Sequence, residues 1–269
     1  QKVNVNYTLP LRKIKILDWT KLTTKYSASY EWRNAPPASK SLGNTIQNSR
    51  SIAVNGNLNF VSLYNKVPFM KKINRPPPRK KLTKDLDENG EDKVNKEEQK
   101  EGMSSAARSL FKFIMMLKQA QFGATFTDGT TLPGFTPSID LLGQNFGKNT
   151  PGFPFILGAQ DETFRNTIAA NGFLTTDTNQ IARYLNLSSV DITGSATIEP
   201  IKGFRISVNF NKRQSFNVTS NFRYSQTQSD FDDVFYTEVG TFTTSFGTWN
   251  TMFDKLNDDY SSAAFDKIK

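Results

Sequence analysis

Hydrophobic and polar residues alternate with a period of two along much of the chain. The clearest run extends from residue 204 to 224, and its first apolar residues share one parity, at Phe204, Ile206, Val208 and Phe210. Polar residues occupy the other parity, at Arg205, Ser207, Asn209 and Asn211. In a β-strand, such alternation places the two sets of side chains on opposite faces. The same pattern predicts further strands at residues 3–9, 22–32, 52–60, 120–127, 190–198 and, more weakly, 239–250.

The predicted strand at 204–224 is long. At about 3.3 Å per residue it would extend roughly 70 Å, whereas strands in globular proteins usually have about 3–10 residues. Such a length favours the wall of a transmembrane barrel that continues past the bilayer. The alternative is a hairpin that turns at residues 211–214 and keeps its phase across the turn.

The connections between the predicted strands also favour a barrel. Residues 198–204 form a tight turn, while residues 33–49 and 128–185 are long and fall on the opposite side if every strand crosses once. Alternation of short turns and long loops is typical of outer-membrane barrels. The segment 128–185 is rich in Gly, Pro and Phe, which predicts an ordered loop packed by its own side chains. A β-sandwich is the alternative, because it tolerates seven strands, whereas the smallest membrane barrels have about eight.

The sequence therefore predicts an all-β segment of a large transmembrane antiparallel β-barrel, whose missing wall lies outside these residues or in another chain. Barrel strands are expected in 1–74, a short helix and a strand in 103–127, and further strands with a trailing periplasmic segment in 186–269. Residues 75–102 contain a triple proline followed by mixed charge, which predicts a disordered insertion. Short amphipathic helices are predicted on either side of it, at 60–73 and 104–117, the second capped by Ser104 or Ser105.

Few residues suggest catalysis or metal binding. The chain contains no Cys and no His, which excludes disulfides, His acid–base chemistry and nearly every zinc site. The adjacent carboxylates Asp232/Asp233 and Asp258/Asp259 would point to opposite faces of a strand, so acidic loop decoration is the better interpretation. We therefore predict that the chain is not an enzyme and binds no cofactor.

A calcium site and a nucleic-acid interface are both weakly indicated. Asp85, Asp87, Asn89 and Gly90 match the start of an EF-hand loop, but Lys96 holds the twelfth position, where a bidentate carboxylate is required, and Glu97 comes one residue late. The basic excess behind the net charge of +9 lies in residues 1–102, away from any groove with interleaved aromatics. This distribution does not favour nucleic-acid binding.

Several segments resemble the SprA (Sov) family, the outer-membrane translocon of the type IX secretion system of Bacteroidota. They are 42–48 (LGNTIQN), 59–68 (NFVSLYNKVP), 132–135 (LPGF), 152–153 (GF), 157–160 (LGAQ), 196–200 (ATIEP) and 248–249 (TW). The resemblance covers most of the chain but not 75–102, and only part of a very long family member. It identifies the chain as an internal piece of a longer protein.

The resemblance implies a channel in the outer membrane that exports folded proteins bearing a type IX C-terminal signal, including gliding adhesins. The implied partners are a PorV-type barrel, a periplasmic plug protein, other type IX subunits, cargo proteins and membrane lipid. In such a barrel Phe204, Ile206, Val208 and Phe210 would face lipid, Arg205, Ser207, Asn209 and Asn211 would face the lumen, and the long loops would manage passage. The alternative is another outer-membrane barrel, such as a TonB-dependent receptor or a surface adhesin.

Overall fold

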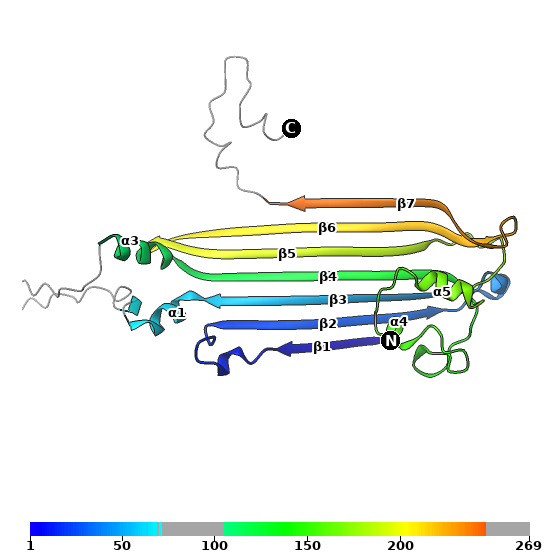
Figure 1. Cartoon of the computed structure of the whole chain (residues 1–269), viewed down its shortest axis with the longest axis horizontal. Coiled ribbons are helices and arrows are strands. Elements are labelled where there is room, and N and C mark those ends of the chain that lie inside the picture. The colour runs from blue at the N-terminus through cyan, green and yellow to red at the C-terminus, as the bar shows by residue number, and fades with distance from the viewer. Residues whose placement is uncertain (69, 72–104, 246–269) are drawn as a thin grey trace, which may run out of the picture.

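The computed structural model describes residues 1–68, 70–71 and 105–245. In this part of the chain, seven antiparallel strands form one sheet in chain order (Figure 1). The predicted antiparallel all-β class is thereby confirmed. β1 and β7 each pair with a single neighbour, so the described sheet is open. The strands are β1 (Lys2–Thr8), β2 (Thr20–Arg33), β3 (Asn44–Asn59), β4 (Leu117–Phe135), β5 (Tyr184–Ile201), β6 (Phe204–Ser225) and β7 (Asp230–Thr244).

β6 is one continuous strand of 22 residues. It pairs with β5 from Ile206, opposite Ile198, to Ser220, opposite Tyr184. The alternative of a hairpin turning at residues 211–214 is therefore wrong. The actual turn lies between β5 and β6, where Gly203 has a φ of +88°. A two-residue hairpin loop requires such a left-handed conformation, which glycine adopts without steric cost.

Three strands extend well beyond their predicted ranges. The three predicted ranges stop at the same level of the sheet. β3 begins at residue 44 rather than 52, β4 continues to 135 rather than 127, and β5 begins at 184 rather than 190. The predicted loops at 33–49 and 128–185 consequently shrink to 34–43 and 136–183. The reason is that polar residues interrupt the apolar parity at Arg50, Asp128 and Ser188, which lie side by side in register. The alternation stops there, whereas the backbone pairing continues.

The range that the alternation predicts for β7 is also wrong. It covers 230–244 rather than 239–250, and residues 246–250 lie outside the described part of the chain. Phe235 has a φ of +56° within an irregularity between the pairs Val234–Asn221 and Thr237–Thr219. Such a bulge inserts extra residues into one strand and reverses its parity. A pattern of period two therefore breaks in the middle of β7.

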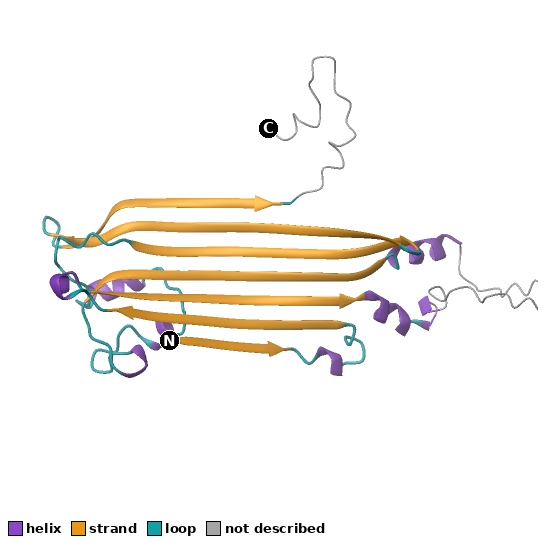
Figure 2. Ribbon diagram, turned by 180° about the vertical axis from the view of Figure 1, so that it is seen from behind, coloured by secondary structure: helices purple, strands orange, loops and turns teal. Residues whose placement is uncertain are grey.

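The sheet has two different ends, which we call the helix end and the loop end (Figures 1 and 2). At the helix end lie residues 9–19, with η1 (Leu11–Lys13), residues 60–68, 70–71 and 105–116, with α1 (Phe60–Lys66) and α3 (Ser105–Ile114), and the turn at 202–203. At the loop end lie residues 34–43, with η2 (Pro37–Leu42), residues 136–183, with η3 (Leu141–Gly143), α4 (Phe153–Ile156) and α5 (Phe164–Ala170), and the turn at 226–229.

Each end thus holds one very long connection, and the predicted alternation of short turns and long loops is wrong.

Both predicted helices that flank the insertion are present, in shorter form. The insertion at 75–102, its calcium motif and the side chains proposed to cap α3 lie outside the described residues and side chains. Among the helices that the structure describes, none is both long and apolar enough to cross a membrane.

Residues 136–183, here called the cover loop, fold back onto one face of the sheet (Figure 1). We call this face A and the opposite face B. Where the pairing of β2 to β6 is regular, even-numbered residues lie on face A and odd-numbered residues lie on face B. The core lies between face A and the cover loop. Its sheet residues include Tyr30, Ile46, Leu132, Tyr184 and Phe222, and its cover-loop residues are Phe155, Ile156, Ile168 and Leu174.

A close approach between two glycines closes this core at the loop end. A Cβ on Gly43 would lie 2.7 Å from the carbonyl carbon of Gly134, and both residues have positive φ angles, +76° and +83°. Thr175 donates its backbone N–H to the Gly134 carbonyl over 2.8 Å and its hydroxyl to the Ser41 carbonyl over 2.6 Å. The two segments therefore meet backbone to backbone, and a side chain on Gly43 would separate them.

We expect Gly43→Ala to destabilise the cover loop by about 2–4 kcal/mol, because it adds overpacking to left-handed strain. Gly172→Ala is the matched control: its φ is +70°, but a Cβ there meets nothing within 4 Å. The control should lose only about 1–2 kcal/mol, the cost of the left-handed conformation. Urea unfolding followed by protease resistance of the cover loop measures both, and equal losses would contradict the close approach.

Candidate membrane-facing surface and its polar boundary

Face A carries an apolar band on the half of the sheet nearest the helix end. Its members lie in register across adjacent strands: Ile52 opposite Phe126 and Phe126 opposite Val190 form one row, for example. On β5 the band extends from residue 190 to 198, or roughly 25–30 Å at about 3.3 Å per residue. That height matches the hydrocarbon core of a bilayer. The band comprises Leu22, Ile52, Val54, Leu58, Phe122, Ala124, Phe126, Val190, Ile192, Ile198, Ile206, Val208 and Phe210.

The residues predicted to face lipid lie on face A, at the β6 side of this band. Ile206, Val208 and Phe210 stand opposite Ile198, Ala196 and Gly194. Phe204 stands opposite Ile201, beside the turn. All four side chains are exposed. The sheet thus presents them on an apolar surface that no described segment covers.

The residues predicted to face a lumen, odd-numbered on β6, share face B. Arg205 falls where the pairing with β5 shifts register, and the other three have small polar neighbours. Ser207, Asn209 and Asn211 stand opposite Thr197, Ser195 and Thr193. The same face continues over Gln121 and Gly123 on β4 to Asn57 and Asn55 on β3. A hollow opens here, lined on this face by Lys21, Thr23, Asn55, Gln121, Thr193 and Asn209. Hydroxyl and carboxamide groups line most of this hollow, in which Lys21 is the one charged residue among the described lining residues. Elsewhere on face B, Asp191 is paired with Arg213 over 2.8 Å.

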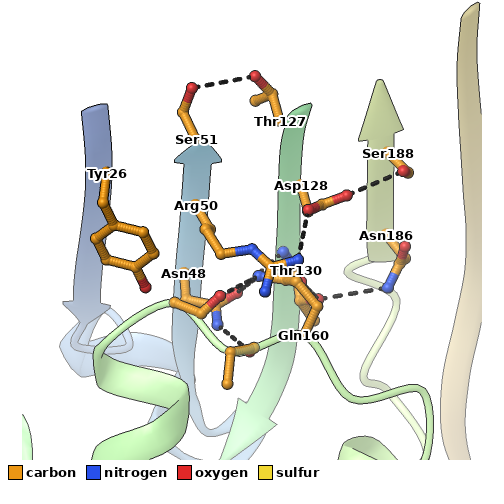
Figure 3. Close-up of polar contacts among 12 residues, drawn as sticks. Tyr26, Asn48, Arg50, Ser51, Thr127, Asp128, Thr130, Gln160, Asn186 and Ser188 are labelled. Atoms are coloured by element: carbon orange, nitrogen blue, oxygen red, sulfur yellow. Dashed lines mark hydrogen bonds and ion pairs between the residues drawn. The ribbon is translucent and has the colours of Figure 1, made fainter. Parts of the chain in front are cut away.

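The apolar band ends abruptly at a row of polar side chains, the polar boundary (Figure 3). In this row Arg50 Nη2 lies 2.8 Å from Asp128 Oδ2, and the Ser188 hydroxyl donates to Asp128 Oδ1 over 2.9 Å. One step closer to the loop end, Asn186 Nδ2 donates to the Thr130 hydroxyl over 3.4 Å. Face A thus changes from apolar to charged across β3, β4 and β5 at one level.

Asn48 connects this boundary to the cover loop. Its side-chain amide donates to the carbonyls of Phe155 and Ala159, each over 3.0 Å. Its oxygen accepts from the Thr130 backbone N–H and from Gln160 Nε2, each over 3.1 Å. Asn48 is only 1% exposed, and these four bonds use every donor and acceptor of its carboxamide. The residue therefore fixes the cover loop to β3 and β4.

The segment Leu157-Gly-Ala-Gln160 supplies most of the cover-loop side of this contact. Gly158 has a φ of +90°, and a Cβ there would lie 3.1 Å from the Cβ atoms of Ala28 and Arg50. Tyr26 donates its hydroxyl to the Leu157 carbonyl. Gln160 accepts from the Thr130 hydroxyl over 2.8 Å. Gly158 therefore lets the backbone of the cover loop approach the sheet, and Gln160, two residues later, bonds to the sheet through its carboxamide.

A second anchor joins α5 to β6 and β7. Arg165 makes two hydrogen bonds to Asp233, of 2.8 and 2.6 Å, and its guanidinium lies 4.7 Å from the Tyr184 ring centre and 4.9 Å from that of Phe222. The Ser220 hydroxyl donates to Asp233 over 2.6 Å. The interpretation of Asp233 as acidic loop decoration is therefore wrong. No local pattern could have found this pair, because its partners are far apart in the sequence.

Two titratable groups outside the apolar band, Tyr64 and Asp177, also make hydrogen bonds to nearby backbone. Burial raises the pKa of Tyr64 in α1, whose hydroxyl donates to the carbonyls of Ile114 and Leu117 over 2.8 and 3.0 Å. In the cover loop, the backbone N–H of Asn179 lowers the pKa of Asp177. Both groups hold chain segments in place.

Tyr30 belongs to the core beneath the cover loop, and the partly buried Trp32 packs against that core. In the described part of the chain, no three carboxylates converge where they could hold a metal ion.

No family model matches the chain, and a search of curated proteins finds no match either.

Proposed function

We propose that the sheet is one section of the wall of a large outer-membrane β-barrel, with face A toward lipid and face B toward an aqueous lumen. The observation that carries this proposal is the apolar band, which has the height of a bilayer and ends on β3, β4 and β5 at one polar boundary. Barrels in the outer membrane have this outward apolar band and a polar interior. The unpaired edges of β1 and β7 are where the rest of the wall would continue.

We further propose that the barrel is the protein-conducting channel of a type IX secretion system. The family resemblance supports this, and the chemistry of face B agrees with it. A lumen that passes many different folded proteins should be hydrophilic and free of large single-sign fields, because strong charge would retain some cargos and repel others. A PorV-type barrel, a periplasmic plug protein and other type IX subunits would be its partners.

In this orientation the cover loop lies outside the lumen. It packs on face A, the lipid-facing side, beyond the polar boundary and therefore above the hydrocarbon. On this proposal the cover loop does not line the path of the cargo. The prediction that the long loops manage passage therefore does not apply to it. Its role would be to cover the parts of β2 to β6 that extend past the membrane.

Depletion of the full-length protein tests the proposed transport function. Proteins that bear the type IX C-terminal signal should accumulate in the periplasm, and re-expression should restore their secretion. Periplasmic proteins without the signal serve as the control and should stay where they are in both states. Normal secretion after depletion, together with loss of uptake of a large nutrient, would contradict the proposal and favour a receptor barrel.

A further inference from the structure

Large apolar side chains are exposed on the surface of the helix end. Each of six residues there is at least half exposed, although the sheet offers a core elsewhere. They come from three separate connections: Ile14 and Ile16 lie between β1 and β2, Leu110 and Phe113 lie in α3, and Ile201 and Phe204 flank the β5–β6 turn.

Hydrogen bonds join these connections at the helix end, where Figures 1 and 2 show them at the same ends of the strands. Tyr64 of α1 bonds to the carbonyls of Ile114, the last residue of α3, and of Leu117, the first residue of β4. The Glu199 N–H donates to the Met116 carbonyl over 2.7 Å, and the Asn59 N–H donates to the Trp19 carbonyl over 2.9 Å. The exposed apolar residues are therefore held at one end of the wall rather than on independent tails.

The same surface is strongly basic. Its described residues, in 9–19, 60–71, 109–118 and 199–205, include nine Lys or Arg and two carboxylates, Asp18 and Glu199. Asp18 is paired with Lys66 over 2.5 Å. Lys118, Lys202 and Arg205 all lie close enough to Glu199 for their charges to act on its carboxylate. Cations thus outnumber acids nine to two among these described residues, whereas the loop-end connections at 34–43, 136–183 and 226–229 hold four cations and four acids.

We propose that the helix end is a phospholipid-binding collar. Its exposed apolar side chains enter the edge of the hydrocarbon, and Lys112, Lys118 and Lys202 reach the phosphates of the adjacent leaflet. Lys carries its charge on a long apolar stem, so it can meet both layers, and basic amphipathic helices bind membrane interfaces in this way. The inference rests on the proposed membrane wall, and it assigns the helix end to the phospholipid-containing periplasmic leaflet.

Lipid retention by the full-length protein tests the collar. The protein is reconstituted in nanodiscs of phosphatidylcholine and phosphatidylglycerol, extracted in mild detergent, and its retained lipids are quantified by mass spectrometry. The unaltered protein should retain phosphatidylglycerol several-fold above its share in the bilayer, and molar salt should reduce this enrichment. The triple variant Lys112→Gln/Lys118→Gln/Lys202→Gln should lose at least about half of the enrichment.

The matched control removes three cations from the loop end, Lys40→Gln/Lys148→Gln/Arg183→Gln, and should retain phosphatidylglycerol like the unaltered protein. Equal retention by both variants, or enrichment that is insensitive to salt, would overturn the collar. Failure of the unaltered protein to enter the bilayer would instead overturn the proposed membrane wall. Entry without any preference for phosphatidylglycerol would overturn the collar alone.

Discussion

Replacement of Val208 by Arg is expected to cost about 2–4 kcal/mol of folding free energy in a membrane, while Asn209→Arg should cost less than about 1 kcal/mol. Val208 lies on face A within the apolar band, two residues from Phe210, which stands opposite Gly194. Its side chain is 49% exposed, so an Arg would fit without overpacking. The penalty would therefore come from lipid around the charge and not from a steric clash.

The neighbouring position makes the comparison specific. Asn209 lies on the same strand at nearly the same depth, but on face B. Urea titration of the barrel in lipid vesicles, followed by the gel shift of folded and unfolded forms, measures both variants. A soluble sheet would place both side chains in water and give two small, similar losses.

Replacement of Asn48 by Leu is expected to cost roughly 3–5 kcal/mol and to release the cover loop. Leu has a similar size but cannot bond, so the Thr130 N–H and the Ala159 carbonyl would lose the partner that Asn48 gives them, while the Phe155 carbonyl would keep the Gly158 N–H. Each such group costs about 1–3 kcal/mol. Gln160 would lose less, since it also bonds to Thr130 and to the Gly158 carbonyl.

Hydrogen exchange at the Thr130 amide and limited proteolysis of the cover loop report this release directly. Asn55→Leu is the control, because Asn55 lies on the same strand with an exposed side chain on face B. Faster exchange and new cleavage between residues 136 and 183 are expected for Asn48→Leu only. Protection equal to that of the unaltered protein would show that Asn48 does not hold the loop.

The sequence predicts the strands well wherever one face is apolar along its whole length. β6 keeps the parity of Phe204 to Phe210 close to the helix end, and its continuous pairing agrees with that alternation. On β3, β4 and β5 the same rule fails at Arg50, Asp128 and Ser188, because the surroundings of face A change there from the uncovered apolar band to the cover loop. Period-two patterns report the surroundings of a strand, so they cannot detect a strand whose surroundings change midway.

The contacts that hold the cover loop could not be predicted from local patterns. Asn48 and Phe155, or Arg165 and Asp233, are brought together only by the register of the whole sheet. Three segments that the sequence analysis singled out, 42–48, 132–135 and 157–160, nevertheless lie at the contacts of Gly43 and Asn48. Leu132-Pro-Gly-Phe135 supplies two fully buried core residues and the glycine that meets Gly43, and Leu157-Gly-Ala-Gln160 supplies the partner of Asn48. Their unusual residue choices follow from docking onto face A.

Cysteine accessibility along β6 tests the orientation of the sheet most directly. The chain has no Cys of its own, so Ile206→Cys, Ser207→Cys, Val208→Cys and Asn209→Cys each introduce a single thiol into this segment. A charged, water-soluble maleimide is applied to outer membranes that contain each full-length variant, freed of any other thiols. We predict labelling of the face B positions 207 and 209 and protection of the face A positions 206 and 208. Labelling of both sets alike, or of 206 and 208 alone, would contradict a wall with face A in lipid.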